Sequence, residues 1–307
     1  PGGAWERIES YPGTSPYSLC TGPSGVTVGD LNALYTYSSG DWTSVEGEFM
    51  GNPVTAVAEV EGVGLVAGMT HSISVDRLEG TGLALVTPEG VTRHVPPGGL
   101  FNDVVSVGVT GDGACWVDAN RSGVAYLSGG GWTRLDYDVL PSNNQVFALE
   151  ASGETIYAGS HAHGITWIHW DGHKPSKGIT FTGEDGLIND QVEAVSIWDE
   201  GTAWFAQRPF QQSTEPSGVC RLTWEPGNPE TAVISPVSGA QGMPSRFVWD
   251  IEAIASDTVY AATEAGLAMV VLPPGVSRIY TIADGLPSNY VASVAVTGSG
   301  DIFAGTA

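Results

Sequence analysis

One short pattern recurs along the chain, and it constrains the fold more than any other feature. A turn containing Gly, Pro, Ser or Asn leads each time into a run of alternating apolar residues. The copies are GTSPYSLC at 13, GNPVTAVAEV at 51, GLFNDVVSVGV at 99, VLPSNNQVFALEA at 139, GLINDQVEAVSI at 186, GMPSRFVWDIEAI at 242 and GLPSNYVASVAV at 285. From Leu100 onward the copies are 40, 47, 56 and 43 residues apart. A period of about 44 residues is typical of repeat architectures.

Each repeat has the same internal order of four short strands. The anchor turn is followed by an alternating strand, a Gly/Asp/Ser turn, a strand with a central aromatic residue, a Gly-led third strand and a short fourth strand. With 42 Gly and 19 Pro as turn residues and no helical periodicity, this order is typical of propeller blades. We therefore predict one all-β domain over residues 1–307, a seven-bladed β-propeller. Its blades are expected to begin near residues 15, 52, 100, 140, 187, 243 and 286.

The last repeat contains only its first two strands, GLPSNYVASVAV and DIFAGT. The N-terminal stretch GGAWERIE resembles GGGWTRLD at 129, which follows the fourth-strand pattern. We therefore predict that residues 2–9 form the outer strand of the last blade, closing the ring and covering an exposed sheet edge. The third strand of that blade is unaccounted for. Either the chain is cut after Ala307 or this blade has three strands.

The sharpest repeats resemble a known family. Asp-Gly-Leu-Pro-Ser-Asn-x-Val, then a Gly/Asp turn and an apolar-aromatic-apolar strand ending in Thr, is similar to the two-component-regulator propeller repeat. Residues 284–306 match it best, followed by 140–159 and 185–206. In that family such repeats form propellers in the extracytoplasmic sensing regions of bacterial regulators and in other secreted or surface proteins. The resemblance implies a periplasmic, cell-surface or secreted location. It specifies function weakly, because propellers host many unrelated activities.

The charge of the chain excludes some partners. There are 34 acidic against 11 basic residues, a net charge of −23, which disfavours binding to nucleic acid. No stretch approaches 18 apolar residues and the first residues, PGGAWERIE, lack signal-peptide features, so we expect no insertion into a membrane. The three cysteines lie in separate repeats, and we expect free, buried thiols.

The segment SHAHGITWIHWDGHKPSKG contains four histidines, at 161, 163, 169 and 173. The expected strand order places the first two at one end of a blade and His173 at the other, about 30 Å away at roughly 3.3 Å per residue. At most His161 and His163 could share a ligand, so we predict no metal site. The chain has no Gly-x-Ser-x-Gly elbow and no phosphate-binding glycine loop. We predict no cofactor and no catalytic residues.

The anchor turns and the turns between second and third strands are expected to share one face of the ring, called here the anchor face. Two of the latter turns are long, at 68–82 and 206–218, and inserted loops often mark a binding face. We predict that this face contacts a ligand or partner through the following residues: His161, His163, Arg208, Phe210, Arg246, Asn289 and Tyr290.

The predicted function is a non-catalytic extracytoplasmic binding or sensing module. Its partner would be a protein or a small polar ligand such as a glycan. One alternative is a structural subunit of a surface or extracellular assembly. A third is a propeller lyase or hydrolase. The streptogramin lyases, also seven-bladed, rely on His and Glu with a metal ion near the channel, but their repeat pattern is absent from this sequence.

Overall fold

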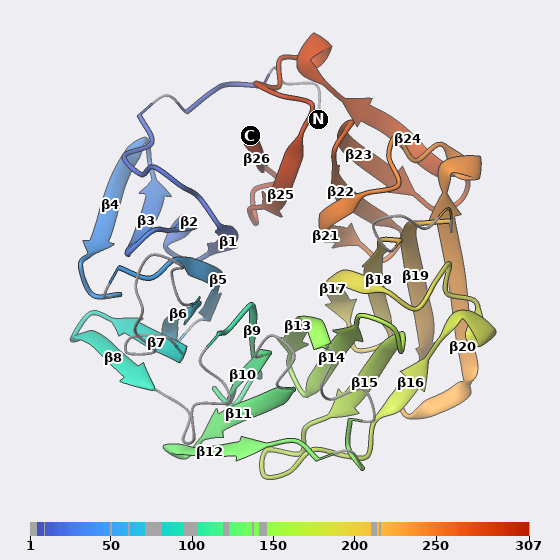
Figure 1. The fold of residues 1–307 in the computed structure, drawn as a ribbon, viewed down its shortest axis with the longest axis horizontal. Coiled ribbons are helices and arrows are strands. Elements are labelled where there is room, and N and C mark those ends of the chain that lie inside the picture. Colours follow the sequence, from blue (N-terminus) through green and yellow to red (C-terminus); the bar gives the residue numbers. More distant parts are fainter. Residues whose placement is uncertain are drawn as a thin grey trace.

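The strands form a ring of antiparallel sheets around a central axis (Figure 1). The structure is a computed structural model that describes residues 5–8, 10–49, 51–60, 62–70, 82–94, 103–118, 123–136, 138–140, 146–209, 214 and 216–306. In each complete blade the first strand lies next to the axis and the fourth lies at the perimeter (Figure 1). The fold is an all-β propeller.

Six blades have four strands each. Blade one comprises β1 (Ser18–Gly22), β2 (Gly25–Asp30), β3 (Ala33–Ser38) and β4 (Asp41–Glu46). Blade two comprises β5 (Val54–Val60), β6 (Gly64–Met69), β7 (Gly82–Thr87) and β8 (Gly90–His94). Blade three comprises β9 (Ser106–Val109), β10 (Cys115–Asp118), β11 (Val124–Ser128) and β12 (Gly131–Arg134).

The second half of the chain continues the pattern. Blade four comprises β13 (Val146–Ser152), β14 (Thr155–Ser160), β15 (Ile165–His169) and β16 (Ile179–Phe181). Blade five comprises β17 (Val192–Asp199), β18 (Thr202–Gln207), β19 (Gly218–Glu225) and β20 (Asn228–Ser238). Blade six comprises β21 (Val248–Ala255), β22 (Thr258–Thr263), β23 (Gly266–Val271) and β24 (Gly275–Tyr280). A terminal sheet of two strands follows, β25 (Val291–Val296) and β26 (Ile302–Thr306).

The prediction of seven blades closed by the N-terminal strand is wrong. The structure has six blades and the terminal sheet, and the described N-terminal residues 5–8 belong to no strand. The physical reason is the missing partner. In blade three the fourth strand, β12, is held by hydrogen bonds to the third strand, β11. Residues 5–8 would need such a third strand in the terminal sheet, and among the described strands β26 pairs only with β25.

The innermost layer of the ring is nevertheless continuous. Strand β25 lies against β21 on one side and against β1 on the other. The Thr21 hydroxyl donates a hydrogen bond of 2.9 Å to the carbonyl of Val296, joining the first blade to the terminal sheet. Contact between inner strands therefore closes the ring, while the outer layer is incomplete at this position (Figure 1).

The hydrophobic core lies between successive sheets. The alternation of side chains along each strand gives every blade two apolar faces, and each face packs against a neighbouring blade. Between blades three and four, for example, the buried Trp116 and Trp170 rings meet edge to face at 5.3 Å. Between blades four and five, the indole of Trp224 donates a 3.0 Å hydrogen bond to the Tyr157 hydroxyl.

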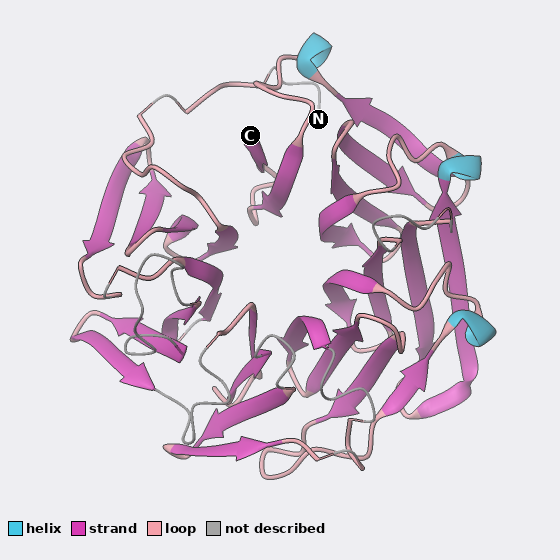
Figure 2. Ribbon diagram, viewed as in Figure 1, coloured by secondary structure: helices cyan, strands magenta, loops and turns pink. Residues whose placement is uncertain are grey.

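Among the described residues, three single turns of 3-10 helix lie at the perimeter, a feature that the strand pattern did not predict (Figure 2). They are η2 (Gly183–Asp185), η3 (Gly239–Gln241) and η4 (Ile282–Asp284). Each begins after a Thr or Ser in a capping box and ends at a glycine with positive φ, 112° at Gly186. The sequence signal is Thr/Ser-x-x-Asp/Gln-Gly directly before the anchor.

No helix among the described residues has the length and apolar character needed to cross a bilayer.

Candidate functional site

The antiparallel register brings anchor turns and long loops together on the anchor face. The first residue of β17, Val192, pairs with the last residue of β18, Gln207. Val248 and Thr263 are paired in the same way in blade six. A residue that follows a second strand therefore lies beside the anchor of its own blade. Arg208 shows this, because its backbone N–H faces the carbonyl of Gln191 at 3.4 Å.

Three aromatic rings form a row on this face, across blade six and the terminal sheet. Phe247 and Trp249 are stacked, with ring centroids 6.1 Å apart and planes at 15°. Trp249 in turn packs against Tyr290, with centroids 5.9 Å apart. Tyr290 is 37% exposed, so the row is open to solvent at this end.

Two arginines lie against the row. The Arg208 guanidinium is 4.9 Å from the centroid of Trp249, and its Nη2 is 3.1 Å from Oε1 of Glu193. The exposed Arg246 lies 5.4 Å from the centroid of Phe247. We call these six residues the anchor-face cluster: Glu193, Arg208, Arg246, Phe247, Trp249 and Tyr290.

Local sequence explains the placement of the rings. Val248 is fully buried, so the alternation of the strand turns its neighbours Phe247 and Trp249 away from that side. The Phe247 N–H donates to the Ser245 hydroxyl at 3.0 Å, and the Tyr290 N–H donates likewise to Ser288 at 3.0 Å. Such local turns fix the direction of the chain where each first strand begins.

The structure brings together three of the residues that the sequence singled out, Arg208, Arg246 and Tyr290, through contacts with Phe247 and Trp249. Asn289 is adjacent in sequence but faces its own turn, because its Oδ1 accepts a 2.9 Å hydrogen bond from the N–H of Ile282. We therefore assign Asn289 a role in holding η4.

The remaining predicted residues lie apart from the cluster. His161 and His163 are in the turn between β14 and β15, as expected, and the His161 ring lies 4.9 Å from that of Phe147 in blade four. His163 is exposed. Phe210 lies outside the described residues, as does most of the long loop at 68–82.

Sequence reasoning missed Glu193, Phe247 and Trp249. The signal was present, since two aromatic residues flank a valine at the anchor of one repeat, in RFVWD, and a third precedes the equivalent valine in the last repeat, in NYVAS. An alternating aromatic pattern at a strand start is ordinarily attributed to the core.

A group of acidic side chains lies on the first strands of blades four and six: Glu150 in β13, and Asp250 and Glu252 in β21, directly after Trp249. Asp250 accepts from the N–H of Val294 at 2.9 Å, and Glu150 accepts from the N–H of Ile197 at 3.0 Å, so both link neighbouring blades. Burial raises the pKa of Asp250 to about 6. Burial, and then the charge of Asp250, raises the pKa of Glu252 to about 8. Burial likewise raises the pKa of Glu150 well above its usual value. These acids therefore hold protons at neutral pH more readily than exposed carboxyls do.

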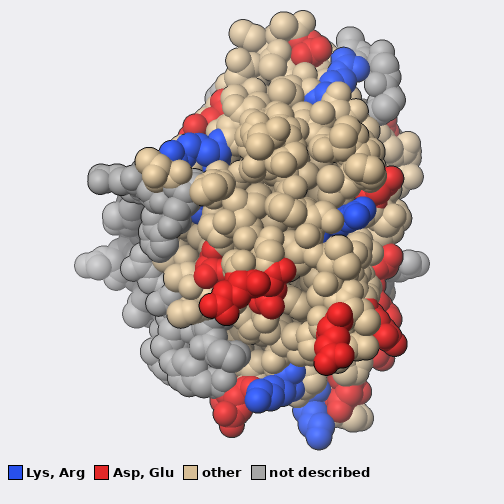
Figure 3. Space-filling model, turned by 90° about the vertical axis from the view of Figure 1, so that its right-hand side faces the viewer, with Lys and Arg blue, Asp and Glu red and all other residues tan. Residues whose placement is uncertain are grey.

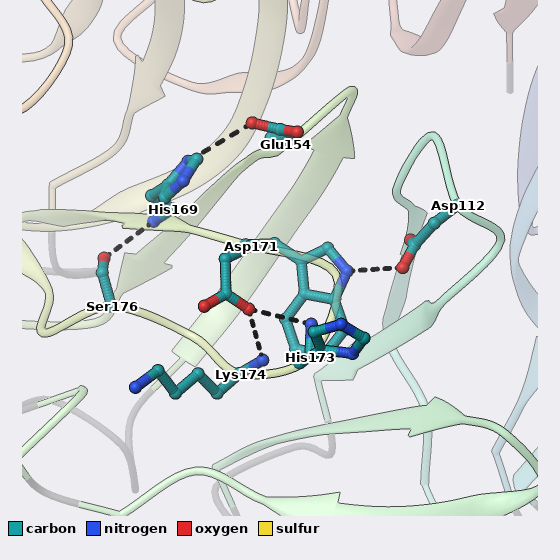
Figure 4. A network of polar contacts seen from close by, with 8 residues as sticks. Asp112, Glu154, His169, Asp171, His173, Lys174 and Ser176 are labelled. Carbon is teal, nitrogen blue, oxygen red and sulfur yellow. Dashed lines mark hydrogen bonds and ion pairs between the residues drawn. The ribbon is translucent and has the colours of Figure 1, made fainter.

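The opposite end of blade four carries the rest of the histidine-rich segment (Figure 4). Asp171 accepts hydrogen bonds of 2.8 Å from the N–H groups of His173 and Lys174, which makes a tight turn. His169 Nδ1 is 3.9 Å from Glu154 at the surface, beside a hollow of about 250 Å³. Asp112 accepts a 2.8 Å hydrogen bond from the Trp170 indole. These contacts stabilise turns.

The part of the chain that the structure describes contains no group of three or more His, Cys, Asp or Glu side chains placed to hold one metal ion. The thiols of Cys115 and Cys220 are free and buried as expected, and Cys20 is half-buried. Burial raises the pKa of Cys115 to about 11 and that of Cys220 to about 12, so neither thiol forms a thiolate readily.

The outer side of the ring over β20 and β24 carries acidic side chains in small groups, with a few basic ones between wide uncharged areas (Figure 3). The anchor-face cluster holds two of the 11 basic residues of the chain, Arg208 and Arg246.

Comparison by sequence finds no matching family profile and no matching curated protein. Comparison with solved structures finds propellers. The extracellular domain of the putative one component system BT4673 from B. thetaiotaomicron superposes with a TM-score of 0.63 at 15% identity, over 97% of this chain and 38% of that one. The chain thus spans well under half of that domain. A streptogramin B lyase gives a TM-score of 0.68 at 11% identity, over 96% and 91% of the two chains. The WD40 β-propeller domain of Doa1 gives 0.63 at 13% identity, over 99% and 92%.

These likenesses show the β-propeller fold. At such identities they show no shared activity, because one fold hosts many functions.

Proposed function

We propose that the protein is a non-catalytic binding module of an extracytoplasmic protein, and that it recognises a small polar ligand such as a glycan through the anchor-face cluster. The single observation that carries the proposal is the row of Phe247, Trp249 and Tyr290 with Arg208 and Arg246 against it. Aromatic and arginine side chains dominate the energetics of recognition surfaces.

The geometry suits a ligand with one flat apolar face and polar edges. The exposed end of the row offers an aromatic surface at Tyr290, while Arg246, against Phe247 at the other end, supplies a polar group. A few placed polar groups around an aromatic surface are typical of small-molecule sites. The cluster is drawn from two blades and the terminal sheet, so its shape depends on the ring and not on one loop.

The extracytoplasmic location is supported by the BT4673 neighbour, which is an extracellular domain of a putative one component system. The resemblance of the repeats to those of two-component regulators points in the same direction. We propose that the chain belongs to this class of propeller.

A glycan array probed with labelled protein tests the proposal. We expect at least one glycan to bind the wild type and to lose binding in Trp249→Ala and in Arg208→Ala. Trp198→Ala is the matched control, because Trp198 is 44% exposed near the other end of β17. Binding that survives the first two changes and is lost in the control would contradict the proposal. If no glycan binds and the protein instead retains another protein in a pull-down, the alternative of a structural subunit in an assembly would be favoured.

A further inference from the structure

A hollow of about 250 Å³ lies between blades four and five, on the face opposite the anchor face. Its lining residues are Glu154, Thr155, Trp167, His169, Glu200 and Pro226. All six, and the residues on either side of each in the sequence, belong to the described part of the chain. Glu200 follows the end of β17, whereas Glu193 of the anchor-face cluster lies near its start, so the length of a strand separates the hollow from the cluster.

Two stacked rings form one wall of the hollow. The ring centroids of Trp167 and His169 lie 6.1 Å apart, with their planes at 20°. Trp167 is only 6% exposed, and its ring meets that of Trp224 edge to face at 5.0 Å in the core between the two blades. The aromatic wall is therefore fixed before anything binds. Such a surface suits the apolar face of a ligand or a cation.

The indole N–H of Trp167 has no hydrogen-bond acceptor. Its nitrogen is buried, and no atom of the described residues accepts from it. The indole of Trp224, in the same core, instead donates a 3.0 Å hydrogen bond to the Tyr157 hydroxyl. A buried donor without a partner is destabilising, and such donors are rare in folded proteins. Because Trp167 lines the hollow, a molecule bound there can supply the acceptor.

The charges around the hollow indicate what kind of molecule it binds. Glu154 comes from blade four and Glu200 from blade five, and no Lys or Arg is among the six lining residues. The third ionisable group among the six is His169, whose Nδ1 is 3.9 Å from Glu154 (Figure 4). Two carboxylates beside an aromatic wall attract a cation.

We propose that this hollow binds a small organic amine that also carries hydroxyl groups, such as an amino sugar. The ammonium group of the ligand pairs with Glu154 and Glu200, and a hydroxyl oxygen accepts from the indole N–H of Trp167. The hollow is smaller than the roughly 300–1,000 Å³ of sites for drug-sized ligands, which suits a ligand of one ring. A lysine side chain fits less well, because its ammonium group has no acceptor to offer the indole.

Titration with glucosamine, followed by NMR of the indole N–H signals, tests the proposal. The Trp167 signal is assigned by its loss in Trp167→Phe or, if that variant does not fold, by its proximity to the His169 ring. We expect this signal to shift saturably, with half-saturation below about 10 mM. The signal of Trp170, which already donates to Asp112 at 2.8 Å, should stay in place. Glucose lacks the amine and N-acetylglucosamine lacks its charge, so both should bind at least about tenfold more weakly.

Two neutral variants locate the site. Glu154→Gln and Glu200→Gln change exposed carboxyls while keeping their shape, and each should weaken glucosamine about tenfold. Glu184→Gln is the matched control, because Glu184 is an exposed carboxyl in η2, before the anchor turn of blade five. The absence of a saturable shift at Trp167, equal binding of glucose, or an equal loss of affinity in Glu184→Gln would overturn the proposal.

Discussion

The guanidinium of Arg208 lies 4.9 Å from the ring centroid of Trp249 and 3.1 Å from the carboxylate of Glu193. One side chain at the end of β18 thereby joins the first strands of blades five and six. The Arg208 and Glu193 side chains are 21% and 16% exposed, so their contact is partly shielded from solvent. The cluster is held in place before any ligand arrives, which lowers the entropy cost of binding.

The contact between Arg208 and Glu193 should contribute a measurable interaction energy to the stability of the fold. We expect a double-mutant cycle of Arg208→Ala and Glu193→Ala, followed by urea unfolding, to give an interaction energy of about 1 kcal/mol. The partial burial of both groups places the value at the upper end for surface pairs. A coupling indistinguishable from zero would mean that the pair does not fix Arg208 on Trp249.

Glu252 should make the protein less stable as the pH rises. The pKa of this carboxyl is about 8 in the folded state against an ordinary 4.5. The folded chain keeps the proton where the unfolded chain has lost it, so the stabilisation is complete below about pH 4.5 and declines as the pH rises towards 8. We expect thermal unfolding at pH 5 and pH 8.5 to show the decline.

Glu252→Gln isolates this contribution from the general repulsion of an acidic chain. The variant should be more stable than the wild type at pH 8.5, by roughly 1–3 kcal/mol, and similar to it at pH 5. Asp250 and Glu150 lie in the same acidic group and keep part of the pH dependence. A variant with the wild-type pH profile would show that Glu252 titrates normally.

Trp5→Ala should lower the free energy of unfolding far less than Trp170→Ala does. Trp170 is 1% exposed and bonded to Asp112, so its loss is expected to cost about 3–5 kcal/mol. Trp5 is half-buried and packs on Tyr280 without belonging to a strand, so we expect about 1–2 kcal/mol. Chemical denaturation compares the two. Equal losses would show that the N-terminal segment is as integral as a blade strand.

Thr21→Val tests the closure of the inner ring. The change keeps the shape of the side chain but removes the hydrogen bond to Val296, at an expected cost of about 1 kcal/mol. Thr43→Val is the matched control, since its hydroxyl makes only an exposed 3.4 Å contact. If both variants melt at the wild-type temperature, the hydroxyl of Thr21 contributes nothing to closure.

The repeats made the fold class predictable from sequence, and the number of blades was wrong for an identifiable reason. The stretches GGAWERIE and GGGWTRLD look alike, but similarity of pattern does not supply a hydrogen-bonding partner. Trp132 lies in β12 because β11 is beside it, whereas Trp5 packs through its side chain on the apolar cluster around Tyr280, with no described strand pairing to its backbone. Whether a segment with this pattern forms a strand therefore depends on a neighbouring strand that can share its backbone hydrogen bonds.

The candidate site was predictable in part. The expected topology indicated the anchor face, and Arg208, Arg246 and Tyr290 do lie together there. The rings that join them, Phe247 and Trp249, could not be separated from core residues by alternation alone. The role of Asn289 in its own turn also required the three-dimensional structure.

Calorimetric titration of the tightest glycan from the array into three proteins tests the central claim most directly. The account predicts measurable binding to the wild type and to Trp198→Ala, and a loss of tenfold or more, about 1.4 kcal/mol, in Trp249→Ala at a temperature where all three proteins are folded. Equal affinity of Trp249→Ala and wild type would contradict the assignment of the anchor-face cluster as the binding site.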